Sequence, residues 1–121
     1  MARILVADDS TAHINMVSEI LKKHQHDIIV ANDGLQACQL AISEQPDLII
    51  MDVVMPNLNG FQATRKITHN PETGNIPIIM LTAKEQEADK VWALRQGARG
   101  YVAKPPDEKE LMELINSLIP S

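Results

Sequence analysis

The segment "RILVADDS", residues 3–10, is an apolar run that ends in two adjacent aspartates and a serine. Continuous apolar runs of this length are typical of strands that are buried on both faces of a sheet. Ser10 is a favourable N-cap residue, so the pattern predicts that a helix begins directly after the strand. Two carboxylates at the end of a buried strand are costly unless a positive group meets them. Asp8 and Asp9 therefore indicate a site at this strand end.

Four more short apolar runs follow along the chain, and segments of helical period separate them. The runs are "DIIVA" 27–31, "DLIIM" 47–51, "IPIIML" 76–81 and "GYVA" 100–103. Continuously apolar strands that alternate with helices predict a parallel sheet covered by helices on both faces. Right-handed crossovers then give a doubly wound α/β fold. We expect a single domain over residues 1–121, a three-layer sandwich with the flavodoxin-like strand order 2-1-3-4-5.

Apolar residues between the runs recur at helical spacing and predict which helix faces are buried. In chain order these are Ile14, Val17, Ile20 and Leu21; Leu35, Cys38 and Ile42; Phe61 and Ile67; Ala88, Val91 and Trp92; and Leu111, Leu114, Ile115 and Leu118. Asp107, with Glu110 three residues later, predicts the N-terminal cap of the last helix. Because Cys38 is the single cysteine, it cannot form an internal disulfide, and we interpret it as a small apolar residue.

The composition argues against several classes of function. The 121 residues contain 11 Lys and Arg against 16 Asp and Glu, which gives a formal net charge of −5 without any basic run. Nucleic acid is therefore not an expected partner. The N-terminus lacks the pattern of a signal peptide, and no segment approaches the roughly 20 apolar residues of a membrane span. We expect a cytoplasmic protein that does not insert into the membrane.

Polar side chains stand at the carboxyl ends of four of the predicted strands. They are Asp8 and Asp9 after the first strand, Asp52 after the third, Thr82 after the fourth and Lys104 after the fifth. In a doubly wound sheet these ends meet at the edge where ligands bind. Any one of these residues alone is more commonly a helix cap, a turn residue or a solvated charge. Their coincidence at one edge favours a site instead.

Three carboxylates at one edge predict either a raised pKa or a bound cation. A like-charged pair about 4 Å apart costs roughly 4 kcal/mol at an intermediate dielectric. Oxygen ligands without an evident His or Cys favour Mg²⁺ over Zn²⁺, and neither His13 nor His69 has a partner that the sequence identifies. A metal, an ammonium and a hydroxyl around a carboxylate are the parts that phosphoryl transfer to an aspartate requires. The residues alone leave open which aspartate is the acceptor.

Four motifs together resemble the receiver domain of bacterial two-component response regulators, the CheY-like family. They are "ADDS" 7–10, "MDVVMPNLNG" 51–60, "LTA" 81–83 and "KP" 104–105. The resemblance covers the whole chain and implies a receiver domain without an output domain. It also implies that Asp52 accepts a phosphoryl group from the phosphohistidine of a histidine kinase. Pro106 departs from the family pattern, which usually has a bulky apolar residue directly after "KP".

The same resemblance implies roles for the other site residues. Mg²⁺ would be held by Asp8, Asp9, Asp52 and the backbone carbonyl of Val54, with Asp8 acting through water. Lys104 would pair with the phosphoryl group, while Thr82 and Tyr101 would change position as a switch. The peptide bond before Pro105 would be cis, which X-Pro bonds allow at low cost. The chain would then be a phosphoacceptor switch with Mg-assisted self-phosphorylation and self-dephosphorylation rather than an enzyme.

A closer resemblance is to PilH-type regulators of type IV pilus twitching motility, which act with a chemotaxis-like kinase. The segments "FQATRKIT" 61–68 and "DKVWALRQGARGYVAKP" 89–105 carry it. It implies a stand-alone regulator, monomeric when unphosphorylated, that signals by changed protein binding, with pilus machinery as a candidate target. The alternatives are a flagellar chemotaxis-type regulator, a phosphate sink, a pseudo-receiver that binds partners without phosphorylation, and a metal-dependent hydrolase of phosphate compounds.

Overall fold

The computed structural model describes residues 2–82 and 87–119, with only the backbone described for residues 87–89. In chain order the elements are β1 Arg3–Ala7, α1 Thr11–Lys23, β2 Asp27–Ala31, α2 Gly34–Glu44, β3 Leu48–Asp52, α3 Gly60–His69, β4 Ile78–Thr82, α4 Glu87–Arg95, β5 Gly100–Ala103 and α5 Glu108–Leu118. The strands form one parallel sheet in the order β2-β1-β3-β4-β5. The predicted fold class and strand order are confirmed.

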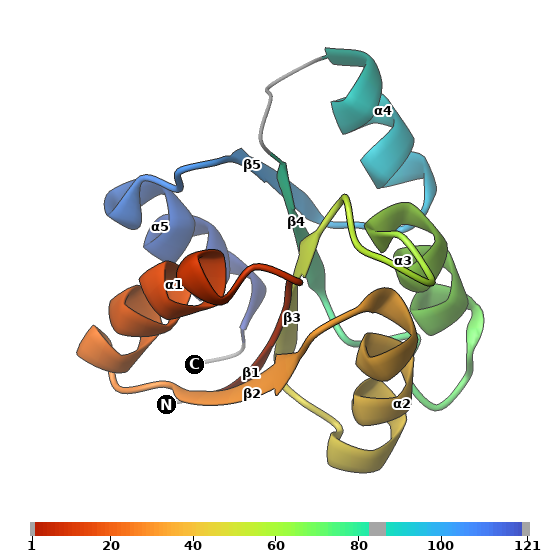
Figure 1. Ribbon diagram of the computed structural model, residues 1–121, viewed down its shortest axis with the longest axis horizontal. Coiled ribbons are helices and arrows are strands. Elements are labelled where there is room, and N and C mark those ends of the chain that lie inside the picture. Colours follow the sequence, from red (N-terminus) through yellow and green to blue (C-terminus); the bar gives the residue numbers. More distant parts are fainter. Residues whose placement is uncertain (1, 83–86, 120–121) are drawn as a thin grey trace.

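The helices cover the two faces of the sheet unequally. Figure 1 shows α1 and α5 on one side and α2, α3 and α4 on the other. Because alternate residues of a strand point to opposite faces, each strand contributes to two cores. In β1, Ile4 and Val6 pack with α1 and α5, whereas Leu5 and Ala7 pack with the helices on the opposite face. Burial on both faces explains why the strands are apolar throughout.

The buried face of α2 differs from the sequence prediction. Leu35 and Ile42, expected in the core, expose 51% and 44% of their surface. The residues that face the sheet are instead Gly34, Ala37 and Ala41, and Cys38 is only partly buried. Small side chains allow α2 to lie close to its neighbours, because an ideal Cβ at Gly34 would stand 1.9 Å from the Leu58 carbonyl oxygen. The larger Leu35 and Ile42 therefore lie on the solvent-exposed side of the helix.

The prediction for α4 was also wrong in its buried face. Val91 and Trp92 expose 43% and 49% of their surface, while Ala93 is fully buried. The side chain of Ala88, the third expected core residue, lies outside the described residues. As in α2, a small residue makes the close contact and the larger apolar residues remain at the surface. For α1, α3 and α5, the core includes the expected Ile14, Val17, Leu21, Ile67, Leu111 and Ile115.

Candidate functional site

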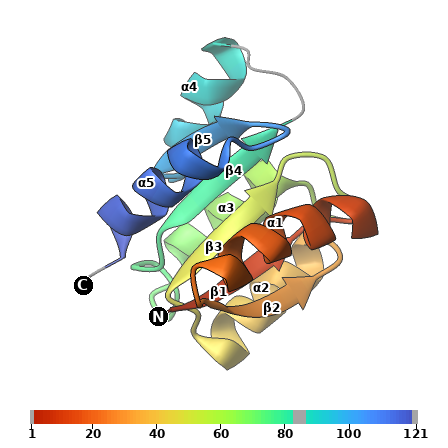
Figure 2. The ribbon, with the colours of Figure 1, turned by 90° about the vertical axis from the view of Figure 1, so that its left-hand side faces the viewer.

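The sheet register places the predicted polar side chains at one edge. Ala7 pairs with Met51, so Asp8 and Asp52 follow at the same level on neighbouring strands. Thr82 ends β4, and its carbonyl accepts a hydrogen bond from the Lys104 backbone at 2.6 Å. The strand arrows in Figure 2 point to this common edge. Four of the five strands thus carry one or two polar side chains at their carboxyl ends, on the same edge of the sheet.

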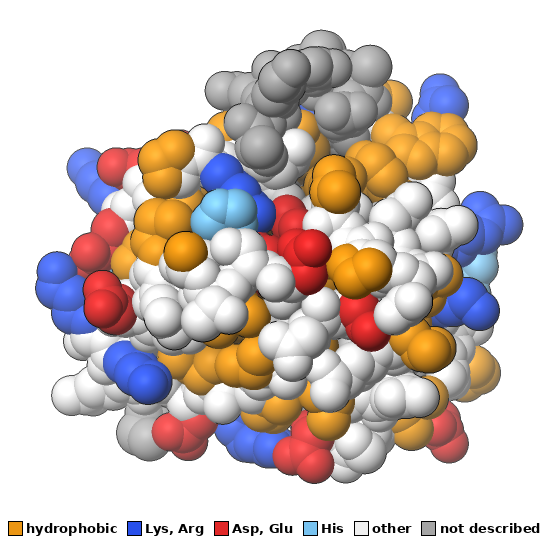
Figure 3. Space-filling model, viewed as in Figure 1, with side chains coloured by type: hydrophobic (Ala, Val, Ile, Leu, Met, Phe, Trp, Pro, Cys, Tyr) orange, Lys and Arg blue, Asp and Glu red, His pale blue; other side chains and the backbone are white. Residues whose placement is uncertain are grey.

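The carboxylates of Asp8, Asp9 and Asp52 form a cluster in which the nearest oxygens all lie within 4.8 Å of one another. Asp8 and Asp52 are 3% and 7% exposed, whereas Asp9 is exposed to solvent. The Lys104 Nζ donates to Asp8 Oδ2 at 2.9 Å and to Asp52 Oδ1 at 2.7 Å. Figure 3 shows acidic side chains near the centre of the visible face, beside basic and histidine side chains. The structure therefore brings Asp8, Asp9, Asp52 and Lys104 together.

The charges in this cluster are only partly balanced. Burial raises the pKa of Asp52 above its ordinary value, and the nearby Asp8 and Asp9 charges add to the rise, while the hydrogen bond from Lys104 opposes it. Burial alone would lower the pKa of Lys104, but its hydrogen bonds to Asp52 and Asp8 outweigh this, so the pKa is raised and the ammonium stays charged. Three carboxylates face one ammonium. An all-oxygen donor set with excess negative charge suits a hard divalent cation such as Mg²⁺.

His13 is a member of the site that sequence reasoning missed. Its Nδ1 lies 3.0 Å from Lys104 Nζ and 3.4 Å from Asp8 Oδ2. An ammonium can only donate, so Nδ1 accepts from Lys104 in the tautomer that carries its proton on Nε2. Its position in the sequence could have indicated this role. Ser10 caps α1 and accepts a hydrogen bond from the His13 backbone, which places His13 in the first helical turn, next to the strand ends.

The other predicted residues surround this cluster. Thr82 is buried, Tyr101 is half-buried on β5, and Val54 exposes 76% of its surface in the segment that follows β3. The Lys104–Pro105 peptide bond is cis, the isomer that the resemblance implies, and Pro106 is buried. Ala83, the last residue of the "LTA" motif, lies outside the described residues.

The N-terminus of α3 fixes the segment that follows Asp52. Asn59 and Gln62 form a reciprocal capping box, and the Gly60 backbone donates to the Val53 carbonyl at 2.8 Å. An ideal Cβ at Gly60 would stand 2.0 Å from the Asp52 carbonyl oxygen, so only glycine fits there. The "NG" pair at the end of the motif 51–60 therefore allows the helix to begin directly against the strand that carries Asp52.

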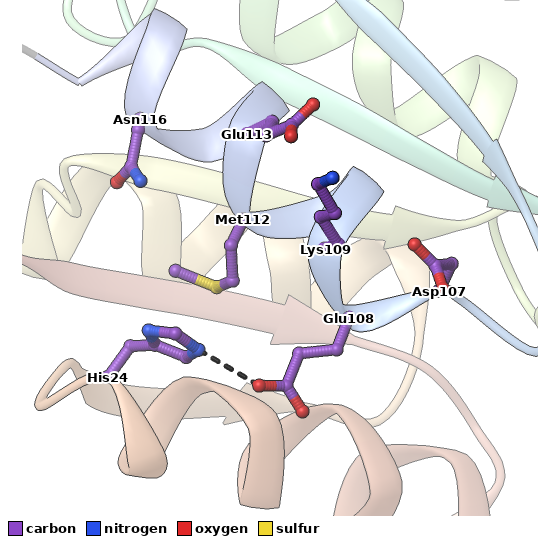
Figure 4. Close-up of a pocket in the computed structure, with 7 residues that line it drawn as sticks. All are labelled: His24, Asp107, Glu108, Lys109, Met112, Glu113 and Asn116. Atoms are coloured by element: carbon purple, nitrogen blue, oxygen red, sulfur yellow. Dashed lines mark hydrogen bonds and ion pairs between the residues drawn. The ribbon is translucent and has the colours of Figure 1, made fainter.

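A separate hollow of about 530 Å³ lies between the end of α1 and α5. In Figure 4, His24 and Glu108 face each other across it, joined at 3.1 Å, and Met112 lies between the helices. Hydrogen bonds from His24 and Lys23 lower the pKa of Glu108. Exposed ion pairs of this kind contribute little to stability. Because none of the clustered carboxylates lines this hollow, the chemical site is the strand edge.

We expect the Asp52→Asn variant to be more stable than the parent at neutral pH when divalent cations are chelated. The raised pKa means that the folded protein binds the Asp52 proton more tightly than the unfolded chain, so the ionised carboxylate costs stability at neutral pH. Removing it should raise the free energy of unfolding at pH 7. The gain should shrink as the pH falls through the raised pKa toward the ordinary value of 3.8. Urea unfolding from pH 7 to pH 4 measures this, and a variant less stable at pH 7 would contradict it.

Residues 4–116 match the family model of the response regulator receiver domain. The chain belongs to this family. It is 50% identical over 119 residues to the protein PilH of Pseudomonas aeruginosa, with 98% of each chain covered. Other curated relatives are longer. The chain spans 26% of the length of the response regulator PleD of Caulobacter vibrioides and 53% of the length of the probable transcriptional regulator ycf29 of Pyropia yezoensis. In these longer proteins, the similarity covers only the part that matches this receiver domain.

Solved receiver structures have the same fold. The chemotaxis protein CheY4 of Vibrio cholerae matches with a TM-score of 0.90 at 30% identity, over 98% of this chain and 99% of that chain. The receiver domain of the sensor histidine kinase PA1611 from Pseudomonas aeruginosa matches with a TM-score of 0.91 at 31% identity, over 99% and 98% of the two chains. That crystal structure has a magnesium ion coordinated in its active site cleft. The CheY-like fold and the receiver family are thus established for this chain.

Proposed function

We propose that this receiver is a stand-alone response regulator whose Asp52 accepts a phosphoryl group from a histidine kinase. The observation that carries the proposal is the convergence of Asp8, Asp9 and Asp52 on Lys104, with Lys104 Nζ 2.7 Å from Asp52 Oδ1. An Asp52 carboxylate oxygen would attack the phosphorus, and the bond from phosphorus to the donor nitrogen would break. The product is an acyl phosphate on Asp52 and a free histidine on the kinase.

Mg²⁺ is the proposed cofactor, held by Asp8, Asp9, Asp52 and the Val54 carbonyl. The oxygen-only donor set supports it, as does the magnesium ion in the cleft of the PA1611 receiver. When bound, the ion supplies positive charge that offsets the repulsion between the carboxylates and the incoming phosphoryl oxygens. Asp9 is the exposed carboxylate of the three and therefore the most accessible ligand for a hydrated ion.

Phosphorylation would act as a switch through local charge. A phosphoryl group adds about −1.5 to −2 charges and three acceptor oxygens next to Asp52. Lys104 is already within hydrogen-bond distance of Asp52, and Thr82 ends the neighbouring strand, so both can meet the new oxygens after small shifts. A shift of Thr82 would then be coupled to Tyr101 on the neighbouring β5, which changes the surface offered to a downstream protein.

The pathway that the relatives support best is type IV pilus twitching motility. The 50% identity to PilH over nearly all of both chains supports a stand-alone regulator of this type, with a histidine kinase as donor and a pilus-related protein or a phosphate-sink role downstream. We propose a cytoplasmic location, and no helix in the described part of the chain has the length and apolar character to cross a membrane. We also propose a monomer when unphosphorylated and no nucleic-acid partner, in line with the net charge of −5.

Intact-mass spectrometry after incubation with Mg²⁺ and acetyl phosphate tests the proposal. We expect a single phosphoryl adduct that is absent from the Asp52→Asn variant and from a chelated sample. The Asp47→Asn variant is a matched control, because Asp47 is a partly exposed aspartate outside the cluster, and it should still take up phosphate. A folded parent protein that binds Mg²⁺ but gives no adduct would instead indicate a pseudo-receiver. Continuous release of phosphate from many substrates would indicate a hydrolase.

A further inference from the structure

The helix α4 leaves large apolar side chains about half exposed to solvent. Val91, Trp92 and Leu94 expose 43%, 49% and 48% of their surface, although Ala93 between them is buried. A helix that packs only on its own sheet normally keeps such residues on the buried stripe. Both ribbon views show α4 at the periphery of the fold, on the side of β5 (Figure 1 and Figure 2). Exposed apolar groups that gather in this way mark interaction surfaces.

A groove of about 360 Å³ lies between α3 and α4. Phe61 and Arg65 of α3 line one wall, and Trp92 and Gln96 line the other. The helices come close at one end, where Thr68 Oγ1 lies 3.0 Å from the Gln96 carbonyl oxygen and 2.9 Å from the Thr64 carbonyl oxygen of its own helix. The groove combines two aromatic side chains with a guanidinium.

The lining of the groove includes the basic Arg65 and no acidic residue, although the chain has a net charge of −5. The helix α3 contains Arg65, Lys66 and His69 and no acidic residue. Arg65 lines the groove, whereas Lys66 lines a separate hollow beside Cys38 and Ile42. The helix α4 carries charges of both signs, Glu87, Asp89, Lys90 and Arg95. Among the ion pairs of the described residues, none involves Arg65. In Figure 3, blue and orange side chains alternate along the right-hand side, over α3 and α4. The opposite end of the molecule is acidic, since α5 and its cap carry Asp107, Glu108, Glu110 and Glu113.

We infer that the groove between α3 and α4 docks a partner protein through an amphipathic helical segment that places acidic residues beside a large apolar side chain. Arg65 presents the planar donor pair that binds a carboxylate in two hydrogen bonds. Trp and Arg are also the residue types that dominate protein interfaces, and a groove between helices fits an amphipathic helix. Charge complementarity therefore selects an acidic segment over a basic one.

Two other occupants fit the surface less well. A second copy could offer its acidic α5 to this groove, and such a head-to-tail contact builds a ring or an open chain rather than a symmetric dimer. Nucleic acid would have to approach a protein of net charge −5. The docking surface does not include Asp52 or Lys104, so the inference stands even if Asp52 never accepts phosphate.

The test uses Trp92 as its own reporter, because it is the single tryptophan of the chain. The probe is a synthetic amphipathic helical peptide with leucines on one face and glutamates on the other, and its matched control carries lysine in place of every glutamate. The titrations use unphosphorylated protein with a chelator present. We expect the glutamate peptide to shift Trp92 emission to shorter wavelength and to bind at least about tenfold more tightly than the lysine peptide.

Two charge reversals locate the binding. We expect Arg65→Glu to weaken the glutamate peptide about tenfold, while Lys22→Glu, an exposed lysine on α1, leaves its affinity unchanged. Equal affinity for the two peptides, or equal effects of the two variants, would overturn the inference. An emission shift that follows protein concentration without peptide would also overturn it, because it would identify a second copy as the occupant. Since no phosphodonor is present, the result is independent of the phosphorylation test.

Discussion

The Lys104→Ala variant is expected to lose roughly 3 kcal/mol of stability when divalent cations are chelated. Its ammonium hydrogen-bonds both buried carboxylates, at 2.9 Å from Asp8 and 2.7 Å from Asp52. Without it, three clustered carboxylates would face one another, and among the described side chains His13 would still contact Asp8. Urea unfolding at neutral pH, with the parent measured beside it, gives the loss directly.

Two controls separate this effect from ordinary loss of a surface charge. Lys23→Ala removes an ammonium from an exposed pair with Glu108, and its cost should stay within about 0.5 kcal/mol. Saturating Mg²⁺ should recover part of the loss in Lys104→Ala, because a bound cation replaces the missing positive charge. If Lys104→Ala is as stable as Lys23→Ala in the chelator, the carboxylate cluster does not depend on the ammonium for its stability.

The sequence predicted the sheet well because parallel strands have a strong local signal. Five short runs of Ile, Val and Leu with helices between them leave few arrangements, and the ends of these runs fixed which polar residues would meet. Asp8, Asp52 and Lys104 could therefore be placed together although they lie far apart in the chain. Their contact follows from topology and not from any feature of the individual residues.

The helix faces were harder to predict because size and contact distance compete with hydropathy. In α2 the periodic pattern selected Leu35 and Ile42, but the close approach to Leu58 requires Gly34 and Ala37 on the inner side. Hydropathy alone gives the larger side chain the greater tendency to be buried. It does not report how near the neighbouring backbone lies. The same competition places Ala93 inside and Trp92 outside in α4.

His13 shows a second limit of sequence reasoning. A histidine in the first turn of a helix is usually a surface residue, and its own neighbours in the sequence are Ala12 and Ile14. Its partners, Lys104 and Asp8, come from β-strand ends, one of them 91 positions away. The strand order β2-β1-β3-β4-β5 brings the segment after β5 to the same sheet edge as the start of α1, so the contact depends on tertiary structure.

The Gly60→Ala variant should be the most damaging single-methyl change near the site. An ideal Cβ at Gly60 would lie 2.0 Å from the Asp52 carbonyl oxygen and 2.9 Å from its carbonyl carbon, so the backbone itself must move. We expect a loss of about 3 kcal/mol or more in the free energy of unfolding, beyond the usual cost of overpacking. Because the clash is with Asp52, phosphoryl uptake from acetyl phosphate should also slow. Urea unfolding and the time course of the intact mass measure the two effects.

Gly74→Ala provides the matched control for this prediction. Its ideal Cβ would meet the Thr68 and Asn70 carbonyl oxygens at 3.0 and 3.2 Å, a tight contact that a small shift can relieve, so its cost should be about 1 kcal/mol. It lies in the turn after α3, away from Asp52, and should leave phosphoryl uptake unchanged. Both variants add one methyl group to a glycine. The difference between their stability losses therefore measures the cost of moving the start of α3 away from the end of β3. Equal stability losses in the two variants, with equal uptake rates, would show that the segment after Asp52 adjusts freely and does not hold the acceptor in place.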